Sequence, residues 1–172
     1  MNRKGFTLVE LLAVVAITAI ILLIAIPNVM EGLNESKMNN FGNEVSTLHD
    51  SAKTQFNLEK GRGQVKYTYD GYERKAVYCQ NWTDNAEDCK NVLSSENQTG
   101  MSYKIVLDVD GNVRYMYISD GRFAYVCYDS YECGHRNLEA CGEFDEYGNN
   151  CIYDSTAGGS APSIEDNRPR LE

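Results

Sequence analysis

Apolar side chains fill the chain from Leu11 to Ile26, and Thr18 is the only polar residue in that run. At about 1.5 Å per residue, a helix from Phe6 to Ile26 is roughly 30 Å long, which matches the hydrocarbon thickness of a membrane. A carboxylate at the centre of such a helix would cost about 2.5–3.5 kcal/mol, so Glu10 needs a place near the interface or a cationic partner. The pattern therefore predicts a membrane-spanning helix with an acid near its start.

After this run the apolar residues recur three or four positions apart, and charged residues lie between them. The apolar positions are Met30, Leu33, Met38, Phe41, Val45, Leu48, Ala52 and Phe56, and the other side carries Glu31, Glu35, Lys37, Glu44, Asp50, Lys53 and Glu59. This spacing is typical of an amphipathic helix. We predict one helix from Thr7 to Lys60, about 80 Å long, with Gly61 as its C-cap. Pro27 should bend or loosen it, because proline lacks the N–H group and crowds the preceding turn.

From Gly61 onward the sequence is rich in tyrosine and contains short runs typical of β-strands. The runs Val65–Tyr69 and Arg74–Tyr78 are candidate strands. Between Tyr103 and Tyr128, Asp110-Gly111 and Asp120-Gly121 separate three runs rich in Val, Ile and Tyr, which predicts an antiparallel meander. One face of this sheet should cover the apolar stripe of the helix.

The first turn of the meander leaves two registers open. A three-residue loop, Asp110-Gly111-Asn112, would place Val113, Tyr115 and Tyr117 alongside Val109, Leu107 and Ile105. A two-residue loop would bring Arg114 opposite Leu107 instead. We favour the three-residue loop, because it keeps apolar residues on one face.

The leader carries Arg3 and Lys4 before the apolar run, so it should stay cytoplasmic and the chain after Pro27 should face outward, where disulfides persist. All the cysteines lie in that outward part: Cys79, Cys89, Cys127, Cys133, Cys141 and Cys151. We expect a local Cys79–Cys89 pair around Trp82. The other cysteines should staple the C-terminal region, in pairs that the sequence leaves open. The segment from Asp154 to Glu172 should be a flexible terminus.

Charge and chemistry narrow the possible functions. The formal net charge is −9, which favours solubility of the outward part and argues against general nucleic-acid binding. Neither His49 nor His135 lies in a recognisable catalytic motif, so we expect no enzymatic activity and no cofactor.

Three groups of side chains were weighed as metal sites, and no metal is expected. Zinc at Cys133, His135 and Cys141 is disfavoured, because disulfides explain these cysteines more simply. The segment Asp108–Asn112 is explained by a hairpin turn. Weak calcium binding near Asp145, Glu146, Asn149 and Asn150 stays open.

The N-terminal residues Lys4-Gly5-Phe6-Thr7-Leu8-Val9-Glu10, with the apolar run and Pro27, resemble the class III signal of type IV prepilins and pseudopilins. An ordinary secretory signal has a shorter apolar core, and a plain membrane anchor would give Glu10 no role. The resemblance implies that a prepilin peptidase cuts between Gly5 and Phe6 and methylates the new amino group. That amine would lie one helical turn from Glu10. Between neighbouring copies the same charge pair would fix the axial stagger, and Pro27 completes the assembly region.

The expected fold is α+β, the pilin lollipop. A cleaved leader (1–5) precedes a long helix (6–60) whose first part (6–26) is membrane or filament core and whose second part (27–60) is amphipathic. A disulfide-stapled head with a small antiparallel sheet and an irregular tail follows (61–172).

The expected function is a structural subunit of a type IV pilus, stored in the cytoplasmic membrane with its head outside and used at the cell surface in adhesion or motility. The implied partners are identical or related subunits, the peptidase, a platform protein and a cytoplasmic ATPase. Two alternatives stay open: a pseudopilin of a type II secretion or DNA-uptake machine, and a membrane-tethered binding domain that never polymerises.

Overall fold

A computed structural model of the chain describes residues 7–69, 73–82, 89, 92–93, 100–128, 133 and 149–157. The chain divides into two compact units, Met1–Lys37 and Met38–Glu172. The second unit therefore contains the C-terminal part of the long helix together with the sheet.

The helix α1 spans Leu8–Gly61, which confirms the single long helix, and it continues without interruption through Pro27. Its C-terminal end differs in one detail from the prediction. Gly63, with φ of 66°, is the left-handed residue that ends the helix, and Gly61 is still helical. The amides of Gly63 and Gln64 donate to the carbonyl oxygens of Lys60 and Glu59 at 3.1 and 2.8 Å, the pattern of a Schellman motif.

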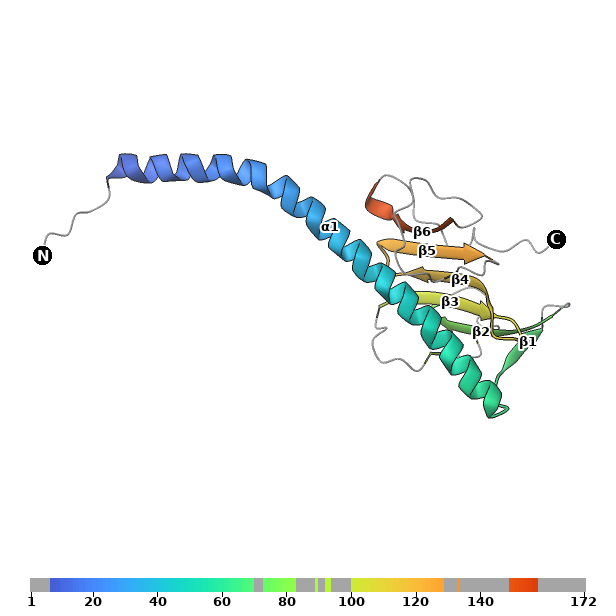
Figure 1. Ribbon diagram of the computed structural model, residues 1–172. Helices are drawn as coiled ribbons and strands as arrows, with labels where there is room; N and C mark the ends of the chain where they lie inside the picture. The colour runs from blue at the N-terminus through green and yellow to red at the C-terminus, as the bar shows by residue number, and fades with distance from the viewer. Residues whose placement is uncertain are drawn as a thin grey trace, which may run out of the picture. The chain divides into compact units, whose positions relative to one another are not determined.

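Six strands form one antiparallel sheet in the order β1-β2-β3-β4-β5-β6, so every strand pairs with its neighbour in sequence. The strands are β1 (Tyr67–Tyr69), β2 (Arg74–Gln80), β3 (Ser102–Leu107), β4 (Val113–Ser119), β5 (Phe123–Tyr128) and β6 (Asn149–Asp154), and a short 3₁₀ helix, η1 (Ser155–Ala157), follows. In Figure 1 the C-terminal part of α1 lies across one face of this sheet. The α+β class and the meander are therefore confirmed.

The register between β3 and β4 corrects the prediction. Leu107 pairs with Val113, Ile105 with Met116 and Lys104 with Tyr117, with a bulge after Val106. The loop between β3 and β4 is longer than the predicted three residues, because the Asp108 carboxylate accepts hydrogen bonds from the amides of Asp110 and Asn112, both at 2.9 Å. An aspartate that closes its own turn in this way competes with a tight hairpin.

The bulge reverses which side chains of β4 face the helix. Val113, Met116 and Ile118 belong to the core cluster under α1. Tyr115 and Tyr117 belong instead to a second cluster on the other face, where Trp82 packs edge-on against Tyr117 with ring centroids 5.4 Å apart. The prediction that Val113, Tyr115 and Tyr117 share one face is wrong for this reason.

The main core lies between the helix and the sheet, as expected. The helix contributes Phe41, Val45, Leu48, Ala52 and Phe56, all of which are at most 2% exposed. Earlier members of the stripe do not take part, since Met30 and Leu33 are 55% and 50% exposed. The last turns of the helix are further anchored by Glu59, whose carboxylate accepts hydrogen bonds from the Tyr78 hydroxyl and from Gln55, both at 2.8 Å.

Gly111 shows how closely the β3–β4 loop approaches the helix. Its φ is 93°, and a Cβ atom there would lie 3.0 Å from the Phe56 ring. Lys60 secures the same loop by donating to the carbonyl oxygen of Val109 at 2.7 Å. A side chain at position 111 would therefore be excluded both by its backbone angle and by its neighbour.

The structure confirms the predicted Cys79–Cys89 disulfide and shows part of the pairing among the other cysteines. Cys79 is bonded to Cys89 and Cys127 to Cys133. Cys151 is also disulfide-bonded, whereas Cys141 lies outside the described residues, as do His135, Asp145 and Glu146. Because Cys133 is consumed in a disulfide, it is not available as the zinc ligand that was weighed.

The sixth strand and η1 correct the expectation of an irregular tail and a flexible terminus for residues 149–157, whereas residues 158–172 lie outside the described residues. Asp154 ends β6, and its carboxylate accepts the guanidinium of Arg122 at 2.8 Å. This contact joins the β4–β5 turn to the end of β6. Hydrogen bonds from Arg122 lower the pKa of Asp154 to about 2. The strand β6 forms by pairing with β5, and local sequence patterns do not reveal such a pairing.

We expect Asp154→Asn to lose about 1–2 kcal/mol of unfolding free energy at pH 7. The folded pKa is about 2, against about 3.9 in an unfolded chain. The ion pair therefore stabilises the fold above the unfolded pKa, and this contribution disappears as the pH falls towards 2. Denaturant unfolding of the detergent-solubilised full chain at pH 7 and pH 2 measures the difference. The exposed Asp110→Asn serves as control, and an equal loss at both pH values would contradict the assignment.

Candidate assembly site

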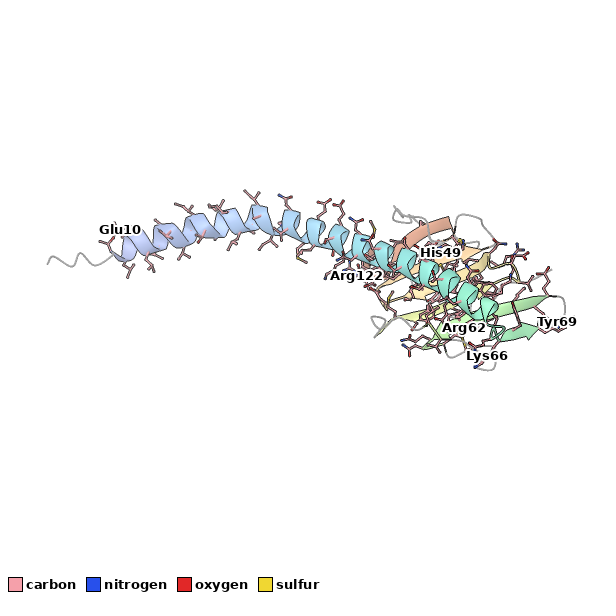
Figure 2. The ribbon with its side chains drawn as sticks, turned by 60° about the horizontal axis from the view of Figure 1, so that its bottom comes forward. Glu10, His49, Arg62, Lys66, Tyr69 and Arg122 are labelled. Carbon is pink, nitrogen blue, oxygen red and sulfur yellow. A yellow bond between two sulfur atoms is a disulfide. The ribbon has the colours of Figure 1, made fainter. Side chains whose placement is uncertain are left out.

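Glu10 closes a hydrogen-bonded ring with Thr7 at the start of α1. The amide and the hydroxyl of Thr7 both donate to the Glu10 carboxylate at 2.9 Å, and the Glu10 amide donates to the Thr7 hydroxyl oxygen at 3.3 Å. This is a capping box, with Thr7 as N-cap and Glu10 three residues later. Figure 2 shows Glu10 at this end of the helix. The acid therefore has hydrogen-bond donors within its own chain.

The side chains that follow Glu10 offer an apolar surface on every side of the helix. The large apolar residues between Leu8 and Ile26 are 55–75% exposed. The helix is long and apolar enough to cross a membrane by length and composition. Such a surface has to be covered by lipid or by other protein, because water disfavours it.

The few polar side chains in and just after this segment bond to the helix backbone. The Thr18 hydroxyl donates to the carbonyl oxygens of Val14 and Val15, both at 3.0 Å, and the Asn28 amide donates to that of Ile24 at 3.4 Å. Pairing of this kind lowers the cost of polar groups in lipid. Glu10 is then the only acidic or basic residue between Thr7 and Met30.

The predicted site residues are only partly placed. Gly5 and Phe6 lie outside the described residues, so cleavage and methylation stay predictions. Pro27 lies 17 positions after Glu10 in the same helix and is not brought near it. The predicted site assigns no role to Thr7. The Thr-x-x-Glu spacing is the pattern from which the cap could have been found.

Metal chemistry has no visible basis in the part of the chain that the structure describes. Within that part, no group of three or more His, Cys, Asp or Glu side chains converges. His49 lies on the helix, where its Nδ1 is 3.1 Å from the carboxylate of Asp50. The chemistry of the site is therefore one of charge, hydrogen bonding and apolar surface.

Known proteins share the N-terminal part of this arrangement. The first 26 residues match the family described as the prokaryotic N-terminal methylation motif. The competence protein ComGC of Bacillus subtilis (strain 168) is 38% identical over 85 residues, which covers 47% of this chain and 85% of ComGC. A ComG operon protein 3 homolog of Bacillus licheniformis is 32% identical over 84 residues, covering 47% of this chain and 86% of that protein. No solved structure matches the chain.

The long helix has an exposed apolar half with a methylation motif at its start, and a meander sheet packs on its second half. These features together define a pilin-like protein. Because the match extends over most of ComGC, the chain belongs to the type IV pilin and pseudopilin family, which includes that protein. Each of these two matches covers 47% of this chain.

Proposed function

We propose that this chain is the structural subunit of a filament that is assembled from membrane-stored copies. The observation that carries the proposal is the exposed apolar half of α1, which begins with one acid in a capping box. Lipid covers this surface while a copy is stored. In the filament, the same surface of other copies replaces the lipid, so the apolar area stays away from water throughout.

Processing prepares the subunit for assembly. A prepilin peptidase removes Met1–Gly5 and methylates the amine of Phe6, which places a positive charge one turn from Glu10. Removing the leader leaves a formal net charge of −11, from 14 Lys and Arg against 25 Asp and Glu. A platform protein and a cytoplasmic ATPase then drive extraction. Because each copy carries a net negative charge, copies repel one another. The attraction between Glu10 of one copy and the Phe6 amine of a neighbour offsets this repulsion and selects the stagger at which the two copies pack.

Among filaments of this family, the relatives favour a DNA-uptake filament. Both are named as ComG or competence proteins, and they are 38% and 32% identical to this chain. The strong negative charge argues that the filament body does not itself hold DNA. Contact with DNA would then fall to other subunits. A surface pilus for adhesion or motility is the second candidate, and it rests on the same helix and signal.

Deletion of the chain separates these candidates. We expect the deletion strain to lose surface filaments and to lose natural transformation by at least a hundredfold, with normal adhesion and motility. The wild-type gene restores both losses. A strain that keeps transformation but loses adhesion or motility would identify the surface pilus instead. Wild-type cells that keep every copy as a single membrane-bound protein would contradict filament assembly altogether.

A further inference from the structure

The part of α1 that belongs to the unit Met38–Glu172 carries a stripe of exposed polar residues with a single charge. Its members lie three or four positions apart, which keeps them on one side of a helix. They are Asn39, Asn43, Thr47, Asp50 and Thr54, all of them exposed, and we call them the Asn/Thr stripe.

Helix geometry places the Asn/Thr stripe opposite the core. Asn43 comes two residues before the buried Val45, and Thr54 comes two residues before the buried Phe56. Two residues correspond to about 200° around the axis at 3.6 residues per turn. Since α1 packs on the sheet through its buried residues, the stripe faces away from the sheet. Within the described part of the chain, no hydrogen bond or ion pair joins the stripe to a residue outside α1.

The composition of the stripe is not explained by the stability of the helix. Asparagine and threonine are weak helix formers, and exposed helix positions are filled better by alanine, lysine or glutamate. The chain as a whole is 24% charged, yet Asp50 is the one charged member of the stripe. The cores of protein interfaces are also poor in charged residues, because a buried charge loses its water. The composition therefore fits a contact with protein.

We propose that the Asn/Thr stripe of one copy packs against a second copy of this chain. The inference rests on the proposed function, since it needs copies that assemble side by side. An asparagine amide both donates and accepts hydrogen bonds, so it can pair with polar groups of an identical chain. The Thr47 hydroxyl already donates to the carbonyl oxygen of Asn43 at 2.8 Å. Burying Thr47 therefore leaves no unpaired hydroxyl donor.

The chemistry of the stripe selects a second copy over other occupants. Copies share a net negative charge, so they approach one another most easily where the surface has few charges. A lipid surface would need apolar side chains, and a polymer of phosphates would need cations. The five residues of the stripe offer neither, and Asp50 repels phosphate.

Photo-crosslinking within filaments tests the contact directly. The full chain carries p-benzoylphenylalanine at Asn43, or in a second variant at Thr54, and intact cells are illuminated before the filaments are sheared off. Immunoblots should show a covalent dimer of this chain from both variants. Asp110 is exposed in the β3–β4 loop, and as the control position it should give at least fivefold less dimer.

A charged side chain placed in the stripe gives a second measurement. Thr47→Arg is expected to reduce the yield of sheared filaments at least fivefold, because a long charged side chain would have to be buried between copies. Thr47→Ser keeps the hydroxyl and is expected to assemble like the wild type. Thermal unfolding of both full-length variants in detergent should match the wild type, since Thr47 is exposed.

Each result decides a different point. Filaments that give no dimer at either position, crosslinks to lipid or to another protein alone, or a normal yield from Thr47→Arg would overturn the contact and leave the filament proposal intact. Absence of this chain from wild-type surface filaments would overturn the filament proposal and the contact with it. A lowered unfolding transition in Thr47→Arg would assign its loss of filaments to the fold, and the crosslinks would then decide alone.

Discussion

Replacing Glu10 by Ala should leave the amount of membrane-inserted protein unchanged and reduce the yield of sheared filaments at least tenfold. Insertion needs only the apolar run, and removing a charge makes insertion easier by up to about 2.5–3.5 kcal/mol. Assembly loses the one charged side chain of the apolar segment, which selects the stagger between neighbouring copies in the proposed filament. Immunoblots of membranes and of sheared surface material from the same cells measure both quantities.

Two further variants separate the charge of Glu10 from its hydrogen bonds. Glu10→Gln keeps a capping box, because glutamine at this position also accepts from the N-cap amide. If charge selects the stagger, this variant should be as defective as Glu10→Ala. Glu44→Ala, on the same helix but outside the apolar segment, is the control and should assemble normally. Normal filaments from Glu10→Gln would show that the cap matters and the charge does not.

Replacing Phe56 by Ala should remove about 3–5 kcal/mol of unfolding free energy, the usual cost of deleting a buried ring. Phe56 is fully buried, packs edge-on against Tyr67 with ring centroids 6.5 Å apart, and contacts the loop at Gly111. Deleting the ring opens a cavity where the helix, β1 and the β3–β4 loop meet. Denaturant unfolding of the solubilised full chain, followed by the fluorescence of Trp82, measures the loss.

Leu58→Ala provides the matched control for this prediction. Leu58 lies two residues further along the same helix and is 55% exposed. Its replacement should change the unfolding free energy by less than about 0.5 kcal/mol. Equal losses in the two variants would mean that the helix does not pack on the sheet through the face that contains Phe56.

Local patterns predicted the elements of this fold well. The 3.6-residue spacing of Phe41, Val45, Leu48 and Phe56 gave the buried side of the helix, and alternating runs separated by Asp-Gly gave the meander. The Cys79–Cys89 bond follows from two cysteines close in sequence, one of which lies next to the end of β2. In each case the residues that determine the structure lie close together in the sequence.

Local sequence patterns did not predict the features that depend on one particular side chain or on pairing between distant parts of the chain. The register of β4 depends on how the Asp108 carboxylate closes its loop, and a shift of one residue changes the face of every following side chain. The strand β6 exists through its pairing with β5, far back in the sequence. The capping role of Thr7, by contrast, could have been predicted from the four-residue pattern Thr-x-x-Glu.

The central claim is that a processed apolar helix leaves the membrane to pack against its own copies. Intact-mass and N-terminal analysis of sheared surface filaments tests it most directly. We expect a chain that begins at a singly methylated Phe6, lacks Met1–Gly5 and contains its cysteines as disulfides. Surface material without this chain, or a chain that keeps Met1 on every molecule, would contradict the account.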